Sequence, residues 1–321
     1  MTDLMTIINK IKSADKIAII SHINPDGDAV GSSLALAIAL RGIGKSVDVY
    51  LQDGVPGIYG FLHGSDTVLE EWNHSEYDIA VALDSGDLER LGRCVEVYNS
   101  SRIKINIDHH ITNTKFGDYS YIETFASSAG EMVYRIIKMS GIDINKEAAE
   151  CLYVSIATDT GGFRYSNTTS ICMQVAADLI NCEIDVSELS QKIFDTISLA
   201  KVKLMGSAID SLEMAGEGKL AVMHVSYGQK ESFGANLDDF DGIVNIARNI
   251  NGVEAAAFLV EKSPNEIKVN FRSNSYIDVS EIAKEFSGGG HKRAAGCTII
   301  SKSIDEAKSI IMERLLKVIR S

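Results

Sequence analysis

The sequence has few of the features that mark a secreted, membrane or thiolate-metal protein. Its five cysteines are scattered and form no CxxC pair, which is typical of reduced structural thiols. No apolar run is long enough to span a bilayer, and residues 1–16 lack the continuous apolar core of a signal peptide. We therefore expect a cytoplasmic protein that has no membrane contact.

Positive charge is also scarce. The chain of 321 residues carries 31 Lys and Arg against 44 Asp and Glu, a net charge of −13. Nearly all of this excess lies in residues 1–186, where 14 basic residues stand against 26 acidic ones, whereas residues 187–321 are close to neutral. A long nucleic-acid-binding surface needs a basic stripe, so this distribution argues against one. It permits a small anionic substrate that is bound locally by metal ions and a few basic side chains.

What the sequence does contain is three short strand-like segments that each end in metal-ligand residues. Residues 16–21, 78–83 and 102–107 are predicted strands. The candidate ligands follow them directly, in the order His22, Asp26 and Asp28, then Asp84, then Asp108, His109 and His110. In an open parallel α/β sheet, ligands bind beyond the carboxyl ends of the strands, so these side chains are expected to meet at one edge.

Most of these residues have an ordinary structural alternative when they are taken alone. Asp26-Gly27-Asp28 can form a turn, Asp84 can cap a helix, and His22 can be a structural histidine. The triplet Asp108-His109-His110 is different, because a buried carboxylate is costly without a partner and such a triplet has little structural use. A divalent metal ion is the partner that the triplet favours.

Asp159 joins the candidate cluster from the end of a predicted helix over 146–162. The candidate ligands are then His22, Asp26, Asp28, Asp84, His109 and Asp159. Mixed imidazole and carboxylate ligands suit Mn²⁺, Fe²⁺ or Zn²⁺, and the lack of thiolates argues against a structural zinc. Six ligands exceed the demand of one tetrahedral site. They fit two ions about 3.5–4 Å apart that share a bridging carboxylate, an arrangement used for in-line displacement at phosphorus.

The first part of the chain predicts a doubly wound, mainly parallel α/β sheet, because predicted strands alternate with predicted helices. A further strand is expected at 45–52, and residues 111–126 are expected to form an irregular loop. Ser128 with Glu131 predicts a capping box, and Asn145 predicts a helix cap. The helices are expected at 3–14, 29–44, 127–141, 146–162, 168–181 and 187–197.

A smaller α/β domain is expected to follow. We place the catalytic domain at 1–186, a linker at 187–203 and the second domain at 204–321. Ser303 with Glu306 predicts another capping box. The predicted strands of this domain span 219–225, 253–261 and 266–273, and its predicted helices span 239–250, 278–286 and 303–320.

The second domain carries its own candidate binding residues. Gly288, Gly289 and Gly290 allow backbone N–H groups to approach a ligand closely, and His291 begins a short basic run. This pattern suits a phosphate or a carboxylate, and the alternative is a flexible loop between two elements. Arg272, near the end of a predicted strand, is a candidate bidentate phosphate clamp, and the alternative is a surface salt bridge.

With these residues in view, the chain resembles the DHH phosphoesterase family with a C-terminal DHHA1 domain. Four segments are similar to the family's motifs in order, namely HINPDGDAVGSS, VALDSGD, DHH and ATDTGGFRYSN. The segment GGGHKRAAG is similar to the DHHA1 signature. Within the family, the length and the pairing of domains resemble the bacterial stand-alone group that acts as an oligoribonuclease and as a phosphatase on adenosine 3′,5′-bisphosphate (pAp).

The resemblance implies a role for each candidate residue. One ion, expected to be Mn²⁺, would bind His22, Asp26 and Asp84, and a second would bind Asp28, Asp84, His109 and Asp159. Asp108 would orient ligands, and His110 would face the substrate phosphate as a charge stabiliser or a general acid. Arg272 and the segment Gly288–His291 would hold the substrate from the second domain, with the active site in a cleft between the domains.

The resemblance implies hydrolysis of short RNA oligonucleotides and nucleoside bisphosphates, and several rivals stay open. A phosphodiesterase for cyclic or linear dinucleotides shares the chemistry. A RecJ-like single-strand exonuclease would be expected to carry a basic groove, and a manganese inorganic pyrophosphatase should lack the GGGH segment. A binding module of the same fold that has lost catalysis should lack a ligand, and none is lacking. The sequence permits a homodimer without predicting one.

Overall fold

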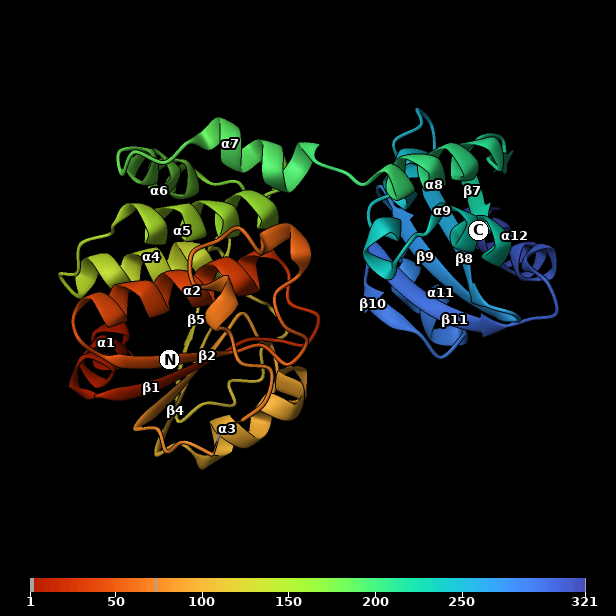
Figure 1. Ribbon diagram of the computed structural model, residues 1–321. Coiled ribbons are helices and arrows are strands. Elements are labelled where there is room, and N and C mark those ends of the chain that lie inside the picture. The colour runs from red at the N-terminus through yellow and green to blue at the C-terminus, as the bar shows by residue number, and fades with distance from the viewer. Residues whose placement is uncertain (1–2, 73, 321) are drawn as a thin grey trace. The chain divides into compact units, whose positions relative to one another are not determined.

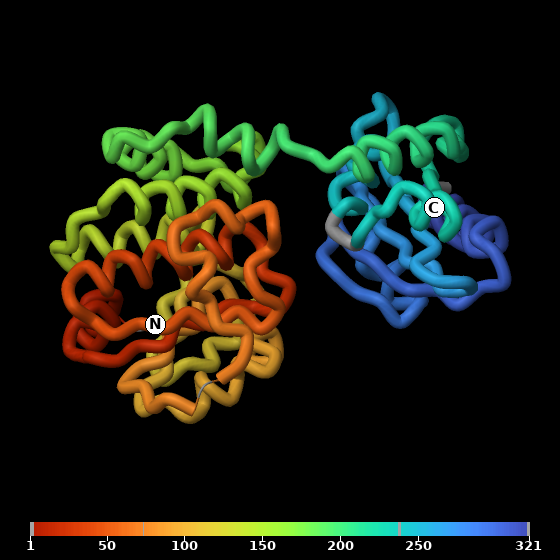
Figure 2. Tube along the Cα trace, in the orientation of Figure 1, coloured from red at the N-terminus to blue at the C-terminus, as the bar shows by residue number. Residues whose placement is uncertain are grey.

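The computed structural model describes residues 3–72 and 74–320. The chain forms two compact units, residues 1–196 and 197–321, and the boundary falls within the residues proposed as a linker, 187–203. Figure 2 traces the chain through the first unit, from red to green, and then through the second, from green through cyan to blue. None of the helices in the described part of the chain is both long and apolar enough to cross a membrane.

The first unit is built on a five-stranded sheet in which every neighbouring pair is parallel. In spatial order the strands are β2 (Ser46–Tyr50), β1 (Lys16–Ile20), β3 (Ile79–Leu83), β4 (Ile103–Asp108) and β5 (Tyr119–Ile122). Because β2 and β3 lie on opposite sides of β1, the winding direction reverses between β1 and β3. The carboxyl ends of these two strands form the switch point at which open α/β sheets bind ligands.

Helices cover both faces of this sheet, as Figure 1 shows. On one face lie α1 (Leu4–Ser13), α2 (Gly27–Gly42), α4 (Ala129–Met139) and α5 (Lys146–Asp159), and on the other lies α3 (Val95–Ser100). Side chains alternate along a strand, so Ile17 and Ile19 pack in the core of the first face while Ala18 and Ile20 pack in that of the second. The predicted doubly wound α/β fold is confirmed.

Two segments of the first unit differ from expectation. Within 111–126, expected to be irregular, β5 pairs with β4; this edge strand is only half-buried, so it lacks the apolar pattern that reveals the other strands. The helix expected at 187–197 is instead α7 (Val186–Ser190) followed by a π-helical turn, Gln191–Asp195. The remaining helix is α6 (Ser170–Ile180), and short 3₁₀ turns span Gly57–Tyr59, Ser65–Thr67 and Glu89–Cys94.

Both predicted capping boxes form only in half. Ser128 Oγ accepts a hydrogen bond from Glu131 N at 3.1 Å, but the Glu131 carboxylate accepts from the backbone N–H of Ser127 at 3.0 Å, one residue earlier than the motif requires. The same displacement occurs in the second unit, where Glu306 N donates to Ser303 Oγ while the Glu306 carboxylate accepts from the N–H of the residue before Ser303. Asn145 caps α5 as predicted.

The second unit holds a six-stranded sheet that is antiparallel except between β7 and β8. In spatial order its strands are β10 (Gly289–His291), β11 (Ala294–Ile300), β9 (Glu266–Ser273), β8 (Ala255–Ser263), β7 (Leu220–Val225) and β6 (Glu213–Ala215). Its helices are α8 (Leu199–Asp210), α9 (Tyr227–Phe233), α10 (Val244–Arg248), α11 (Val279–Glu285) and α12 (Ile304–Arg320), with a 3₁₀ turn at Leu237–Phe240.

The glycine-rich segment of the second unit is a β-hairpin and not the loop between two elements that was one expectation. β10 pairs with β11, with Gly289 opposite Gly296 and His291 opposite Ala294. A Cβ atom added to Gly288 would lie 2.2 Å from the carbonyl oxygen of Gly296, so the hairpin needs glycine there. The backbone N–H groups of this segment therefore serve partly in strand pairing.

Candidate metal centre

The six predicted ligands lie around the carboxyl ends of β1, β3 and β4. His22 lies two residues beyond β1, and Asp26 then caps α2. Oδ1 of Asp26 accepts hydrogen bonds from the backbone N–H groups of Asp28 at 3.0 Å and Ala29 at 3.1 Å. The segment that could have been a simple turn is therefore the start of a helix, where the helix dipole favours carboxylates.

Asp84 lies at the centre of the cluster. It follows β3 with φ of +53°, a region that residues with side chains rarely adopt, and it is only 2% exposed. Nε2 of His22 lies 3.4 Å from Oδ2 of Asp84, and Nε2 of His109 lies 3.4 Å from Oδ1. Oδ1 is buried and has no hydrogen-bond partner among the described residues. Because a buried carboxylate oxygen is costly without a partner, this atom is a candidate ligand for a cation.

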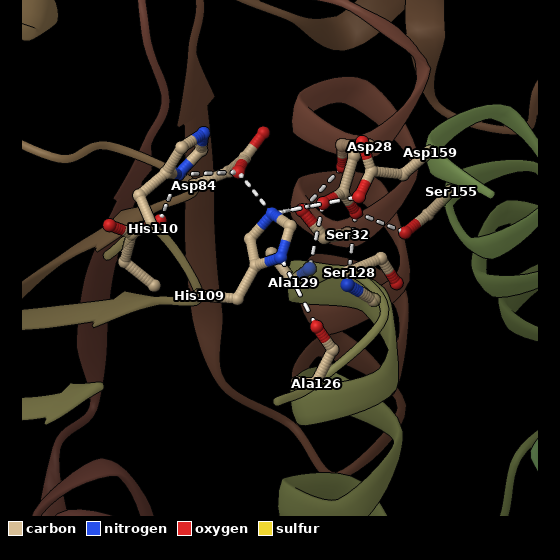
Figure 3. Close-up of polar contacts among 12 residues, drawn as sticks. Asp28, Ser32, Asp84, His109, His110, Ala126, Ser128, Ala129, Ser155 and Asp159 are labelled. Atoms are coloured by element: carbon tan, nitrogen blue, oxygen red, sulfur yellow. Dashed lines mark hydrogen bonds and ion pairs between the residues drawn. The ribbon is translucent and has the colours of Figure 1, made fainter. Parts of the chain in front are cut away.

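The two histidines present the same ring nitrogen to the cluster. Nδ1 of His22 lies 2.8 Å from the carbonyl oxygen of Ile23. Nδ1 of His109 lies 3.3 Å from the carbonyl oxygen of Ala126, as Figure 3 shows. A carbonyl oxygen only accepts, so each Nδ1 carries a proton that it donates, and each Nε2 faces the carboxylates. Metal-binding histidines are usually held in this way by a hydrogen bond from the other ring nitrogen.

Asp28 is fully buried and is held at the amino terminus of α4 (Figure 3). Its carboxylate accepts hydrogen bonds from Ala129 N at 2.7 Å and Gly130 N at 3.0 Å, and also from the hydroxyl of Ser155. A Cβ atom on Gly130 would overlap the Ser155 hydroxyl at 1.9 Å, so glycine is needed for this contact. Oδ2 of Asp28 also lies 3.6 Å from Nε2 of His109, which points the carboxylate into the cluster.

The structure brings all six predicted ligands together in two groups. Within each group the donor atoms lie within 4.8 Å of one another. The two groups are His22 with Asp26 and Asp84, and Asp28 with His109 and Asp159; a third, overlapping group holds Asp84, His109 and His110. The contact between His109 and Asp84 joins them, so Asp84 lies where a bridging ligand would be needed. Carboxylate and imidazole donors in this number fit divalent transition metals, and the buried oxygen of Asp84 that accepts no hydrogen bond among the described residues supports the fit.

The electrostatics of the cluster also favour cations. Burial, with the charges of neighbouring carboxylates, raises the pKa of Asp28, and burial raises the pKa of Asp159 to about 6. The pKa of Asp84 is lowered although burial opposes this, because the imidazoles of His109 and His22 stabilise its charge. The pKa of His109 rises to about 10, since the carboxylates around it outweigh the effect of burial. Divalent cations bound here would supply the positive charge that this cluster needs, in place of protons.

His110 lies beside the cluster, with Nδ1 3.6 Å from Oδ1 of Asp84, and also joins a hydrogen-bond network that sequence reasoning identified only in part. Its Nδ1 donates to Oδ1 of the fully buried Asp108 at 2.7 Å, and this bond raises the pKa of His110. The other oxygen of Asp108 accepts from Nδ2 of Asn113 at 2.6 Å, and Asn113 also contacts Oδ1 of the buried Asn106 at 3.0 Å. The only sequence signal for these asparagines was a polar residue, Asn106, inside a strand.

Asn167 is a further residue that sequence reasoning missed. Its Nδ2 donates to the carbonyl oxygens of Ser127 at 2.9 Å and Asp159 at 3.2 Å, and it lies 3.4 Å from Oδ2 of Asp159. Asp159 is the last residue of α5, so this amide ties the end of the helix to the segment before α4. The orientation of one predicted ligand therefore depends on a side chain eight residues further along the chain.

In the second unit, the strand register brings the predicted substrate-binding residues near one another. His291 pairs with Ala294, and Ala294 pairs in turn with Arg272 on β9. Directly opposed residues in antiparallel strands share a face of the sheet, so the two basic residues lie on one face with a single small residue between them. Nη1 of Arg272 donates to the carbonyl oxygen of Phe271 at 2.9 Å. Their role in substrate binding remains a prediction.

The fold and the cluster together define a class of protein, in which carboxylates and imidazoles gather at the switch point of a parallel sheet and a second α/β unit follows. Residues 16–156 match the DHH family, N-terminal domain. Residues 217–317 match the DHHA1 domain. The two matches lie in different compact units.

Relatives match almost the whole chain. The bifunctional oligoribonuclease and PAP phosphatase NrnA of Bacillus subtilis is 31% identical over 96% of this chain and 96% of that protein. The protein of the same name from Thermus thermophilus is 33% identical over 95% of this chain and 89% of that protein. The crystal structure of an exopolyphosphatase-related protein from Bacteroides fragilis has a TM-score of 0.92 and 30% identity, and covers 99% of this chain and 97% of that chain. The chain therefore belongs to the DHH family and carries a DHHA1 domain, which confirms the resemblance of its motifs.

Proposed function

We propose that the chain is a metal-dependent phosphohydrolase that degrades short oligoribonucleotides from an end and converts pAp to AMP. Two relatives that share about a third of its residues over nearly their full lengths are named for both activities. Both reactions need hydrolysis of a phosphate ester near the end of a small nucleotide. A single cluster of metal ligands in an acidic unit suits such a substrate better than a long strand.

The observation that carries this proposal is the position of Asp84, which faces His22 on one side and His109 on the other and has a buried oxygen that accepts no hydrogen bond among the described residues. We propose that Asp84 bridges two Mn²⁺ ions, one bound by His22 and Asp26 and the other by Asp28, His109 and Asp159. When bound, such ions polarise phosphoryl oxygens and lower the pKa of a water molecule to the neutral range.

His110 is the proposed catalytic residue of the chain itself. Asp108 accepts a hydrogen bond from Nδ1–H of His110 and raises the pKa of the ring, so the protonated imidazole is favoured. Nε2 can then stabilise charge on the substrate phosphate or donate a proton to the leaving oxygen as a general acid. Asp108 is a positioning residue in this scheme, because it reaches the substrate only through His110.

The DHHA1 domain, residues 204–321 after the linker at 187–203, is proposed to bind the substrate. Arg272 would hold a phosphate group, and the hairpin residues Gly288–His291 would contact the nucleotide. Their shared sheet face and the near-neutral charge of this unit support the proposal. The five cysteines are all free thiols, which is typical of reducing compartments, so we place the enzyme in the cytoplasm.

The test is a panel of substrates that includes pAp, a dinucleotide, a cyclic dinucleotide, a long RNA and pyrophosphate, each with Mn²⁺, Mg²⁺ or Co²⁺. We expect pAp and the linear dinucleotide to be hydrolysed fastest, with Mn²⁺ as the best activator. A preference for the long RNA, for pyrophosphate or for the cyclic dinucleotide would assign the chain to one of the rival classes. Tight nucleotide binding without turnover would make it a binding module.

A variant of Asp84 ties the activity to the cluster. Asp84→Ala is expected to abolish Mn²⁺-dependent hydrolysis while the circular dichroism spectrum stays that of a folded protein. Asp143→Ala is the matched control, because Asp143 is an exposed acidic residue in the segment before α5, at the opposite end of that helix from Asp159. Normal turnover by Asp84→Ala would refute the two-metal site.

A further inference from the structure

The first unit has a cavity of about 280 Å³ that none of the proposed roles uses. It lies between the segment that follows Asp159 and the π-helical turn Gln191–Asp195. Its walls include Tyr153, Gly162, Phe163, Arg164, Phe194 and Asp195. The cavity begins three residues beyond a proposed metal ligand, so it adjoins the segment that positions that ligand.

The backbone around the cavity is unusual on both sides. Phe163 has φ of +63°, in the left-handed region that a bulky residue rarely adopts, and Gly162 before it has φ of +70°. On the opposite wall, Phe194 and Asp195 belong to the π-helical turn. Such strain and π turns are found mostly at functional sites, where the surrounding structure holds them in place.

Gly162 has no side chain, and this leaves open space between the aromatic ring of Phe194 and the guanidinium group of Arg164. A Cβ atom added to Gly162 would lie 3.6 Å from the ring of Phe194 and 3.9 Å from Nε of Arg164. The ring of Phe163, also in the wall, packs against Tyr153 with centroids 5.9 Å apart. The space beside Gly162 is therefore bounded by an aromatic ring and a guanidinium group, both of which stack on nucleobases.

The side chain of Arg164 is exposed, and one hydrogen bond to the backbone holds its guanidinium group in place. Its Nε donates to the carbonyl oxygen of Gly161 at 2.5 Å. Over residues 3–72 and 74–320, no ion pair involves Arg164. An arginine held in this way loses little conformational freedom when it meets a base or a phosphate, because its planar fork is already oriented.

We propose that this cavity is a subsite for a second nucleoside, the one joined to the hydrolysed phosphate in an oligoribonucleotide and absent from pAp. The inference rests on the proposed function and deepens it. A volume of about 280 Å³ is just below the range of about 300–1,000 Å³ for pockets that hold small molecules, so it suits one base and part of its ribose. Phe194 stacks on the base, Arg164 binds its edge or the adjoining phosphate, and Asp195 accepts from a ribose hydroxyl.

The test compares two substrates that differ by one nucleoside, pAp and the 5′-phosphorylated dinucleotide pApA. Arg164→Ala and Phe194→Ala are each expected to lower the ratio of kcat/KM for pApA to that for pAp about tenfold, mainly through KM, as loss of one base contact does. Arg102→Ala and Met139→Ala are matched controls, since Arg102 is an exposed arginine beside the amino end of β4 and Met139 is a half-exposed apolar residue at the end of α4. We expect the controls to leave the ratio within twofold of the wild type.

The outcomes separate the two proposals. A wild-type chain that hydrolyses neither substrate would overturn the proposed function, and the subsite with it. A wild-type chain that hydrolyses both, with a ratio unaffected by Arg164→Ala and Phe194→Ala, would overturn the subsite alone. A changed sedimentation coefficient in these variants with an unchanged ratio would show that the cavity receives a second copy of the chain, which also overturns the subsite.

Discussion

Replacing Asn113 by alanine is expected to lower kcat about 10- to 100-fold in a protein that still folds and binds metal ions. Nδ2 of Asn113 lies 2.6 Å from Oδ2 of the fully buried Asp108, whose Oδ1 accepts a hydrogen bond from Nδ1 of His110 at 2.7 Å. Oδ1 of Asn113 accepts from Lys115 N at 2.6 Å, so the amide can turn only its NH₂ group toward Asp108. Asn113 thus fixes the carboxylate of Asp108 by a hydrogen bond, and that carboxylate in turn orients the ring of His110.

The magnitude follows from the burial of Asp108. Leaving one oxygen of a buried charged acceptor without its donor costs about 1.5–3 kcal/mol. If His110 is then no longer held in its productive orientation, that free energy adds to the activation barrier, and the rate falls about tenfold for each 1.4 kcal/mol. Steady-state kinetics on pAp with Mn²⁺ would measure kcat and KM separately, beside a Mn²⁺ titration and a melting curve. Asn181→Ala is the control, because Asn181 is an exposed residue at the end of α6.

Two results would refute this reasoning. An Asn113→Ala variant with the kcat of the control would show that His110 is not positioned through Asp108. A variant that loses activity only because it binds Mn²⁺ more weakly, and regains it at saturating Mn²⁺, would show that Asn113 positions the metal ligands instead.

Three further predictions concern the cluster and the substrate. Without metal, the melting temperature should fall as pH rises from about 5 to 8. The pKa of Asp159 is raised to about 6 in the folded protein, and that of His109 to about 10. The stabilisation from these two groups is complete below their unfolded-state pKa values and is lost as pH rises toward their folded-state pKa values. Calorimetry in the presence of a chelator that shows a rise in melting temperature with pH would contradict this. Asn167→Ala should weaken Mn²⁺ binding about tenfold, since its amide holds Asp159, and an unchanged titration would refute that role. Arg272→Ala should raise KM far more than it lowers kcat, and an unchanged KM would remove this residue from the site.

The convergence of the ligands could be predicted because it depends on strand ends. Parallel strands deliver the residues that follow them to one edge, so Asp84 and His109 had to meet once 78–83 and 102–107 were recognised as neighbouring strands. This prediction needs only the positions of the strands and not the conformation of any loop. Asn113 and Asn167 escaped prediction because their contacts depend on how a loop folds back onto the strand or helix before it, and no periodic pattern records that.

Local hydrogen bonding was predicted less well than the fold. The Ser128 and Glu131 pair fits the capping-box pattern, yet the Glu131 side chain bonds to the residue before the cap, because spacing alone does not fix which N–H a carboxylate reaches. The glycines at 288–290 suit a phosphate-binding segment or a flexible loop, and neither interpretation predicts the hairpin that the segment forms. Their pairing with β11 depends on a partner strand whose register the sequence does not show.

The pair of cations is the central claim, and anomalous X-ray diffraction from a crystal grown with Mn²⁺ tests it most directly. We predict two Mn²⁺ peaks about 3.5–4 Å apart. Asp84 should lie between them, with His22 bound to one ion and His109 to the other. A cluster that binds no Mn²⁺, or binds a single ion that Asp84 does not contact, would contradict the account.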